Sequence, residues 1–352
     1  MPKFKVVVTD YVFENFEQEE AVFAPLDVDL VIRQAKDAAE LMDDVADADA
    51  ILNCYLPGMN RELLQHGKKL KVVVRYGIGV DTINIPDCTE LGIMVANVDD
   101  YCINEVADHA MALFLTLARK IASSGRRTRA GEWSLAYVKP LPAIREMTAG
   151  IIGFGRIGQA IAERLAPFGV KIIFADPGVD DGAGLAAKVE FDELLAQSDV
   201  IFVQCPSNEH TKRLINDESI SQMTKAPLII NAARGAIVDT DALVRALASG
   251  KISGAGLDVL EDEKGVMADE NHPLRTMGNV VLTPHSAWVS NKALPELQRR
   301  AALQAAMVLR GERPTKLLNP EVLKSFGRKR EMVNEDCEDR GRRRSKVCNS
   351  RG

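Results

Sequence analysis

The chain has 352 residues, of which 46% are hydrophobic, so it is long enough for two domains of ordinary size and can bury a core in each. Residues 327–352 carry a net charge of +4, which leaves −10 for residues 1–326, and a body this acidic argues against direct binding to nucleic acid. No apolar run reaches the roughly 18 residues of a membrane span and the N-terminus starts a strand instead of a signal peptide, so we expect a cytoplasmic protein with no membrane contact.

Short runs rich in Val and Ile alternate with segments of helical period along most of the chain. Their residues are apolar at successive positions, which is typical of strands covered on both faces by helices. The pattern predicts an α/β protein with two doubly wound parallel-sheet domains, Rossmann-like or flavodoxin-like. The predicted strands are Lys5–Thr9, Ala50–Cys54, Lys71–Arg75, Gly150–Gly153, Lys171–Ala175, Val200–Gln204, Leu228–Ala232, Gly254–Val259 and Asn279–Thr283.

Two amphipathic segments, Asn104–Ala122 and Leu294–Leu309, follow the first and the last groups of strands. In the first, apolar residues recur at helical spacing as far as Ile121. The simplest architecture makes these helices the connectors and inserts one domain in the other. The predicted parts are a substrate-binding domain over 1–100 and 288–322, a dinucleotide-binding domain over 101–287, and a charged, disordered tail over 323–352.

A glycine-rich loop lies between a predicted strand and a predicted helix over Gln159–Phe168. Its GxGxxG pattern falls on Gly153, Gly155 and Gly158. In dinucleotide-binding domains the first glycine allows a tight turn, the second lets the backbone approach a pyrophosphate, and the third permits close helix–strand packing. We therefore predict that phosphates bind at the start of this helix.

The strand after this helix ends at Asp176, where the fingerprint requires an acid for the ribose 2′-hydroxyl. A carboxylate at this position repels the 2′-phosphate of NADP, so NAD is the predicted cofactor. Taken singly, the glycines also suit an ordinary tight loop and Asp176 a helix cap. The order of strand, loop, helix, strand and acid favours the dinucleotide site.

Residues with suitable catalytic chemistry follow three other predicted strands. Oxidation of an alcohol beside a carboxylate needs a base for the hydroxyl proton and a cation for the carboxylate and carbonyl oxygens. Of the five histidines, His285 directly follows a buried strand; Arg234 follows another, and the segment 257–263 brings acids to the same edge. Ligands bind at the carboxyl ends of strands in such sheets. Alone, each residue also fits a cap, a surface ion pair or a solvated loop.

Several motifs in this order resemble the D-isomer-specific 2-hydroxyacid dehydrogenase family over roughly residues 50–320. The matching stretches are GIIGFGRIGQAIAERLAPFG with Asp176, CPSNEHTKRLIN, NAARGAIVD, AGLDVLEDE and TPHSAW. The stretches VVRYGIGVDTINI and NEVADHAMAL, with Trp288 after TPHSA, are most similar to the C-terminal-binding-protein branch of that family.

The resemblance implies an NAD-dependent enzyme that interconverts a small D-2-hydroxy acid and its 2-keto acid. It implies that Arg234 binds the substrate carboxylate and carbonyl, that His285 donates and accepts the proton, and that Glu263 pairs with this base. The chain departs from the family pattern at Leu260 and at Lys264, where an aromatic residue and a proline are usual. The departure at Lys264 slightly weakens the register of Glu263 and leaves Glu261 as the alternative acid.

The resemblance also implies binding residues. The substrate carboxylate would meet the backbone N–H groups of the loop Arg75, Tyr76, Gly77, Ile78 and Gly79, and Trp288 would line the side-chain pocket. Further cofactor contacts would be Arg156 and Ile157 at the pyrophosphate, and Cys205, Pro206, Thr211, Ala232 and Asp258 around the ribose and nicotinamide.

The alternative function is a binding protein of the corepressor type, in which NAD(H) drives dimerisation and partner peptides dock on the N-terminal domain. Such proteins have the same residue set, so Arg234, Glu263 and His285 do not exclude it. In either case we expect a homodimer, with the irregular segment Gly125–Arg145 covering a surface or contacting the second copy. The six scattered cysteines have no metal-ligand spacing and predict free thiols and no metal site.

Overall fold

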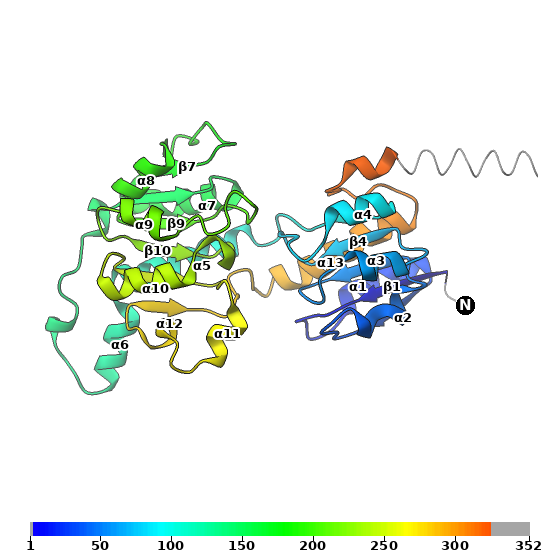
Figure 1. Cartoon of the computed structure of the whole chain (residues 1–352), viewed down its shortest axis with the longest axis horizontal. Coiled ribbons are helices and arrows are strands. Elements are labelled where there is room, and N and C mark those ends of the chain that lie inside the picture. Colours follow the sequence, from blue (N-terminus) through cyan, green and yellow to red (C-terminus); the bar gives the residue numbers. More distant parts are fainter. Residues whose placement is uncertain (1–2, 325–352) are drawn as a thin grey trace, which may run out of the picture. The chain divides into compact units, whose positions relative to one another are not determined.

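The computed structural model describes residues 3–324, which form two compact units (Figure 1). Unit 1 comprises the described residues up to Tyr101 and from Leu294, and unit 2 comprises Cys102–Ala293, so the second is inserted in the first. Nearly all of the segment predicted to be a disordered tail lies outside the described residues. Within the described range, no helix combines the length and the apolar character that a bilayer crossing requires.

Unit 1 contains a five-stranded parallel sheet in the order β2-β1-β3-β4-β5. Alternate strand residues such as Val7 and Ile51 pack against Leu63 and Cys88 of the helices on one face. Its strands are β1 Phe4–Val8, β2 Val28–Ile32, β3 Ala50–Asn53, β4 Val72–Arg75 and β5 Met94–Ala96. Its helices are α1 Glu17–Phe23, η1 Ala24–Leu26, η2 Ala39–Leu41, α2 Met42–Val45, α3 Arg61–His66, α4 Ile85–Leu91, α13 Ala293–Leu309 and η7 Pro320–Val322.

Unit 2 contains a seven-stranded parallel sheet in the order β12-β11-β10-β9-β6-β7-β8. The strands are β6 Thr148–Ile152, β7 Lys171–Ala175, β8 Ala187–Lys188, β9 Val200–Val203, β10 Leu228–Asn231, β11 Gly254–Leu257 and β12 Val280–Leu282. The strand order reverses between β6 and β9, which is the switch point where ligands bind in open α/β sheets.

Helices cover both faces of the sheet of unit 2. Ile151 and Phe202 pack with α5 and α7 on one face, and Ile152 and Val203 pack with α8, α9 and α10 on the other. This explains why the strands are apolar at successive positions. The helices are α5 Ile103–Ala118, α6 Ile121–Arg129, η3 Leu135–Tyr137, η4 Ile144–Glu146, α7 Arg156–Leu165, η5 Ala166–Phe168, α8 Phe191–Gln197, α9 Asp217–Gln222, η6 Gly235–Ile237, α10 Thr240–Ser249, α11 Glu263–Ala268 and α12 Pro273–Thr276.

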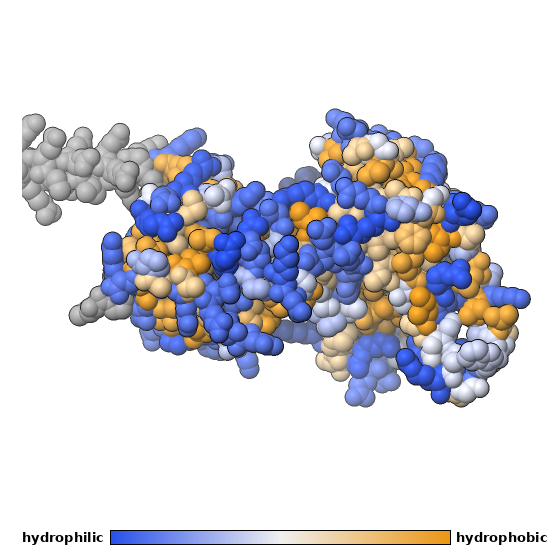
Figure 2. Space-filling view, turned by 180° about the vertical axis from the view of Figure 1, so that it is seen from behind, coloured by the Kyte–Doolittle hydropathy of each residue, from blue (hydrophilic) through white to orange (hydrophobic). Residues whose placement is uncertain are grey.

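The first long helix is shorter than the sequence predicted. It ends at Ala118, because Lys120 adopts a left-handed backbone (φ +50°), and the separate helix α6 begins at Ile121. The side chain of Ile121 is 56% exposed instead of facing the core. Trp133 and Leu135 in the following loop are also exposed. On the face shown in Figure 2, hydrophobic residues are mixed with hydrophilic ones over the surface of unit 2.

The chain returns to unit 1 later than predicted, after Ala293 instead of after residue 287. Two hydrogen bonds tie the intervening segment to unit 2. Ser290 Oγ donates to Glu105 Oε1 of α5 at 2.9 Å, and Trp288 Nε1 donates to the carbonyl of His285 at 2.9 Å. The position of the boundary between the two units therefore depends on these side-chain contacts, and no change in amino-acid composition marks it in the sequence.

Candidate active site

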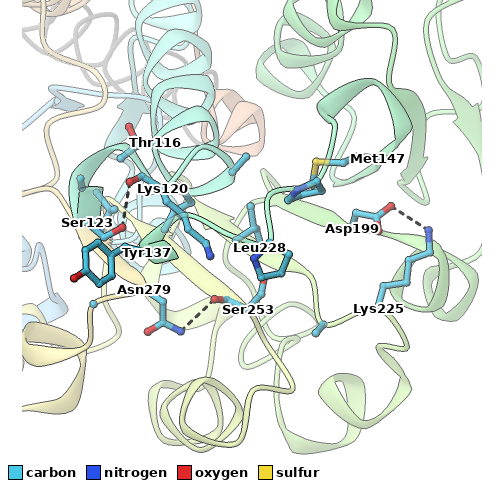
Figure 3. Close-up of a pocket in the computed structure, with 18 of the residues that line it drawn as sticks. Thr116, Lys120, Ser123, Tyr137, Met147, Asp199, Lys225, Leu228, Ser253 and Asn279 are labelled. Carbon is cyan, nitrogen blue, oxygen red and sulfur yellow. Dashed lines mark hydrogen bonds and ion pairs between the residues drawn. The ribbon is translucent and has the colours of Figure 1, made fainter. Parts of the chain in front are cut away.

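A hollow of about 640 Å³ lies in unit 2 at the amino-terminal edge of its sheet (Figure 3). Leu228 begins β10 there, and Tyr137 and Pro140 line it from the segment between α6 and β6. The charged pair in its lining, Lys225 and Asp199, is already joined at 3.0 Å. This edge is opposite to the one where the predicted catalytic residues follow their strands, so the hollow is not the predicted site.

The glycine loop has the geometry that its sequence predicts. Gly153 has φ +90°, and a Cβ on it would lie 2.6 Å from the backbone nitrogen of Cys205, which follows β9. A Cβ on Gly158 would collide with the carbonyl oxygen of Gly153, so only glycine lets α7 start this close to β6. Gly155 has open space around it. The loop and the first turn of α7 therefore leave backbone accessible to a phosphate, at the switch point of the sheet.

Asp176 follows β7 and lies beside the glycine loop. Its Oδ2 accepts a hydrogen bond from the amide of Phe154 at 2.7 Å, and its Oδ1 accepts one from the amide of Gly178 at 2.7 Å. The carboxylate therefore fixes the loop and is partly exposed. These features fit a dinucleotide, whose pyrophosphate would meet the loop and α7 and whose ribose would meet Asp176.

The other residues predicted to bind the cofactor differ in how far they are exposed to solvent. Arg156 and Pro206 are exposed, and Ile157, Thr211 and Ala232 are half-buried. Thr211 Oγ1 donates to the carbonyl of Pro206 at 2.6 Å, which folds their loop. Cys205 is buried, and burial raises the pKa of its thiol to about 11. A bound cofactor would therefore meet the backbone of Cys205 and no reactive thiolate. All four cysteines among the described residues are free.

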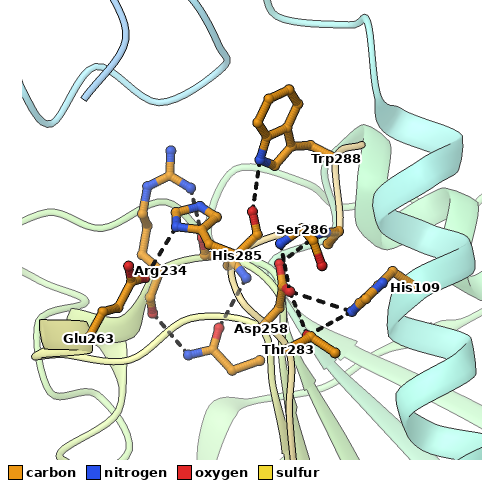
Figure 4. A network of polar contacts seen from close by, with 11 residues as sticks. His109, Arg234, Asp258, Glu263, Thr283, His285, Ser286 and Trp288 are labelled. Carbon is orange, nitrogen blue, oxygen red and sulfur yellow. Dashed lines mark hydrogen bonds and ion pairs between the residues drawn. The ribbon is translucent and has the colours of Figure 1, made fainter. Parts of the chain in front are cut away.

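His285 and Glu263 come together as the sequence predicted. His285 Nδ1 lies 3.2 Å from Glu263 Oε1, and Figure 4 shows Arg234 beside this pair. Glu263 is the first residue of α11, whose N-cap Asp262 accepts from the amide of Gly265. The hydrogen bond from His285 holds the pKa of the Glu263 carboxyl below its ordinary value, and the Arg234 charge acts in the same direction.

The alternative acid, Glu261, has another partner. Its Oε1 accepts from Arg213 Nε at 2.8 Å. The departure at Lys264 therefore does not shift the register, because Lys264 is simply the second residue of α11 and Glu263 still faces the histidine.

Arg234 is held by a turn that follows β10. The buried Asn231 accepts from the amide of Ala233 at 3.0 Å and donates to the carbonyl of Arg234 at 2.9 Å. A Cβ on Gly235 would collide with the backbone of Leu260, so glycine allows this turn to pack against the segment after β11. The side chain of Arg234 is half-buried and donates from Nη1 to the carbonyl of Ala233 at 2.7 Å.

Asp258, which the resemblance places around the ribose and nicotinamide, has a buried carboxylate that is bonded to protein groups. It is 2% exposed, and its carboxylate accepts from the amides of Ser286 and Ala287, each at 2.9 Å. Thr283 Oγ1 donates to the same carboxylate at 2.5 Å and lies 2.9 Å from His109 Nε2 of α5. This buried acid therefore fastens the turn that carries His285.

The contributions of His109 and Thr283 were not predicted. Leu257 pairs with Leu282 in the parallel ladder, so the next residues along the two strands, Asp258 and Thr283, are neighbours. The sequence could have predicted the contact between Asp258 and Thr283 from this register, because an acid and a hydroxyl residue follow two predicted strands that lie side by side in the sheet. His109 was one of the five candidate histidines and lies within the predicted helix Asn104–Ala122, which gave no reason to connect it with the turn at His285.

The predicted substrate loop in unit 1 offers fewer amides than expected. The amides of Tyr76 and Gly77 donate to the carbonyls of Asn53 and Arg75, at 2.8 and 3.0 Å. The Tyr76 side chain is also buried, where its hydroxyl donates to Glu19 at 2.7 Å. The remaining amides, those of Ile78 and Gly79, have no hydrogen-bond acceptor in the part of the chain that the structure describes.

Arg75 is buried beside this loop. Its guanidinium donates to the carbonyl of Tyr76 and lies over the ring of Tyr55, 5.0 Å from the centroid. Gly77 has φ +145°, and a Cβ there would lie 3.0 Å from Arg75 Nη1, so glycine lets the guanidinium lie against the loop. Arg75 therefore places a positive charge next to the loop.

Comparison with known proteins agrees with this geometry. Residues 111–287 match the model of the D-isomer specific 2-hydroxyacid dehydrogenase NAD-binding domain. A glyoxylate reductase from Thermofilum pendens is 37% identical over 307 residues, which are 84% of this chain and 90% of the relative.

Solved structures give the same result. A D-lactate dehydrogenase from Aquifex aeolicus, complexed with NAD and lactic acid, has a TM-score of 0.81 at 28% identity and covers 89% of this chain and 98% of its own. A glyoxylate reductase from Paecilomyes thermophila has a TM-score of 0.82 at 28% identity, over 91% of this chain and 99% of its own. The C-terminal-binding-protein branch stays a prediction. The chain belongs to the D-isomer-specific 2-hydroxyacid dehydrogenase family and is an oxidoreductase that uses a nicotinamide dinucleotide.

Proposed function

We propose that the protein reduces a small 2-keto acid of the glyoxylate class to the corresponding D-2-hydroxy acid, with NADH as the reductant. The observation that carries this proposal is the ion pair of His285 and Glu263 beside Arg234, at the carboxyl ends of the strands that follow the glycine loop. The names of the relatives support a small substrate.

The residues of unit 2 divide the reaction among them. The bound dinucleotide supplies the hydride. His285 donates a proton to the carbonyl oxygen of the substrate, and Glu263 stabilises the positive charge of the imidazolium before that transfer. Arg234 binds the carboxylate and the carbonyl oxygen, which orients the substrate and polarises its carbonyl.

The loop Arg75–Gly79 is our candidate for binding the substrate carboxylate. The amides of Ile78 and Gly79 are available to an anion, and the guanidinium of Arg75 adds positive charge. Unit 1 would then be the substrate-binding domain, as the sequence suggested. Trp288 retains its predicted role at the substrate side chain, although its indole N–H is bonded to His285.

We further infer that the cofactor is NAD and that the protein is a homodimer. Asp176 supports the first inference, because its carboxylate disfavours a 2′-phosphate. Ile121, Trp133 and Leu135 support the second, since large apolar side chains this exposed within one short segment are typical of an interface.

The test is an NADH absorbance assay with a panel of 2-keto acids, using the wild type and His285→Ala. We expect glyoxylate-sized substrates to be reduced, and His285→Ala to lower turnover by about 10²-fold or more while NADH affinity changes by less than about threefold. A wild type that reduces no keto acid, but changes its mass on NADH binding, would favour the corepressor-type alternative.

A further inference from the structure

The turn that carries His285 has an unfavourable backbone conformation. His285 has φ +54°, in the left-handed region that a residue with a side chain rarely adopts. Such a conformation persists only where the surrounding contacts hold it. The direction of the imidazole therefore depends on what fixes this turn.

Asp258 holds the turn from within. Its own carbonyl accepts from the amide of His285 at 2.9 Å, and its carboxylate accepts from the amides of Ser286 and Ala287. Three consecutive amides thus converge on one residue whose side chain is 1% exposed. The carboxylate can serve as this anchor only if it is itself fixed in direction.

His109 and Thr283 fix the carboxylate. The Thr283 hydroxyl has one hydrogen, which it donates to Asp258 Oδ1 at 2.5 Å, so its oxygen must accept from the second neighbour, His109 Nε2, at 2.9 Å. His109 therefore carries a proton on Nε2 and extends the chain of hydrogen bonds from α5 to the turn. Figure 4 shows His109 in contact with Thr283, and also with Asp258 Oδ1 at 3.5 Å, and Asp258 in contact with the turn that carries His285.

The helix α5 holds both sides of the same segment. Glu105, one helical turn before His109, accepts from Ser290 Oγ at 2.9 Å. Residues 283 and 290 are thus bonded to one face of one helix, with His285 between them. The contact through Ser290 keeps the segment attached even where the contact through His109 is lost, so a variant at His109 can remain folded.

We propose that His109 is a positioning residue for the reaction, and that with Thr283 and Asp258 it holds the backbone of His285 in the conformation that aims its imidazole at the substrate. The inference rests on the proposed function in assigning proton transfer to His285. The contacts that carry it, however, can be tested without any substrate.

The experiment compares Thr283→Val with Thr283→Ser, and His109→Phe with its neighbour Asp108→Asn. Valine and phenylalanine keep the shape of the side chain and remove the hydrogen bond, whereas serine keeps the hydroxyl. Asp108 is on the same helix but is exposed and pairs with Arg164, away from the turn. Two quantities are measured: amide hydrogen exchange over residues 285–287, and kcat and KM for glyoxylate with NADH.

We expect exchange at residues 285–287 to accelerate about tenfold or more in Thr283→Val and His109→Phe, and kcat to fall by a similar factor. KM and the affinity for NADH should change by less than about threefold, and Thr283→Ser and Asp108→Asn should match the wild type. Equal kcat in the valine and serine variants, or unchanged exchange in Thr283→Val, would overturn the proposal. If the wild type reduces no keto acid, the proposed function fails, while the exchange comparison still decides whether these residues hold the turn.

Discussion

The Nδ1 atom of His285 and the Oε1 atom of Glu263 lie 3.2 Å apart, although each belongs to a different segment of the chain. The imidazole is 27% exposed and the carboxylate 49% exposed, so both groups remain accessible to substrate and solvent. Because the pKa of Glu263 is lowered chiefly by the hydrogen bond from His285, the carboxylate stays ionised throughout the pH range in which a histidine titrates.

The first prediction concerns Glu263→Gln, which removes this charge and keeps the size of the side chain. We expect kcat for keto-acid reduction to fall by about 10²-fold, because the amide no longer stabilises the imidazolium. Glu261→Gln is the matched control, since Glu261 pairs with Arg213 instead. Steady-state kinetics with NADH measure both, and equal losses in the two variants would argue against a specific role for Glu263.

The lowered pKa of Glu263 also predicts how stability and rate depend on pH. The pKa of Glu263 is lower in the folded protein than the ordinary 4.5, so its pairing with His285 stabilises the fold above about pH 4.5 and is lost as the pH falls below that value. Glu263 therefore cannot cause any change of rate between about pH 5 and 9. If the pH at which the rate changes in this range shifted in Glu261→Gln, the acid that pairs with His285 would be Glu261, and the assignment of Glu263 to this role would be wrong.

Asp176→Ala should relax the preference for NADH over NADPH. The alanine removes the negative charge that a 2′-phosphate would meet, and we expect the ratio of kcat/KM for the two cofactors to fall by about tenfold or more. Because Asp176 also accepts from the amides of Phe154 and Gly178, thermal melting must be measured alongside. Asp180→Ala is the control, since Asp180 is exposed and pairs with Lys188. An unchanged ratio in a folded Asp176→Ala protein would exclude the ribose assignment.

Two glycines of the same loop should respond differently to alanine. Gly155→Ala adds a methyl group in open space, so we expect an unchanged Tm and an NADH Kd raised by about tenfold or more, because the backbone can no longer approach the pyrophosphate. Gly158→Ala forces a methyl group against the carbonyl of Gly153, and should lower the Tm by several degrees. Melting curves and NADH fluorescence titrations separate the two effects; a stable Gly158→Ala protein would contradict the packing role.

The fold was predictable where strands are buried on both faces. Lys171–Ala175 agrees residue for residue, and other central strands agree to within a few residues. The strands that were missed are short or lie at an edge. Val28–Ile32 contains the exposed Asp29, and Ala187–Lys188 is exposed and only two residues long, so neither forms the apolar run that marks a central strand. Met94–Ala96, the third, is apolar and buried but only three residues long.

The site was predictable to the extent that strand order decides it. Residues that follow parallel strands share one edge, which is why His285, Arg234 and the acidic segment 257–263 could be grouped from the sequence. The choice of Glu263 within that segment came from the family resemblance. Side-chain direction is not determined in this way. Tyr76 turns into the core toward Glu19, and Asp258 turns toward the backbone of its neighbouring turn; both directions depend on contacts distant in sequence.

The proposed dimer predicts that its interface depends on the exposed segment after α6. Trp133 is 89% exposed and Leu135 72%, so replacing both with serine should remove apolar contact area and weaken dimerisation by about tenfold or more. Phe168→Ser, at an exposed apolar residue outside this segment, is the control. Sedimentation equilibrium measures the change. A wild type that stays monomeric, or a double variant that dimerises as tightly as the control, would refute the interface.

The last prediction concerns Glu19, a fully buried carboxyl in unit 1 that accepts from the hydroxyl of Tyr76 at 2.7 Å and from Nε2 of Gln298 at 3.1 Å. Burial raises its pKa above the ordinary 4.5, although the hydrogen bond from Tyr76 acts in the opposite direction.

Between the unfolded and the folded pKa, the folded protein holds a proton that the unfolded chain has released. The contribution of Glu19 to stability is therefore complete below about pH 4.5 and is lost as the pH rises through the folded pKa. Glu19→Gln has no such titration, so the Tm of the wild type relative to that of Glu19→Gln should decrease as the pH is raised from about 4.5 to 8. Taking the difference between the two proteins cancels the titration of the groups they share. A Tm difference that stayed constant over this range would show that Glu19 titrates as it does in the unfolded chain, and that the hydrogen bonds from Tyr76 and Gln298 offset its burial.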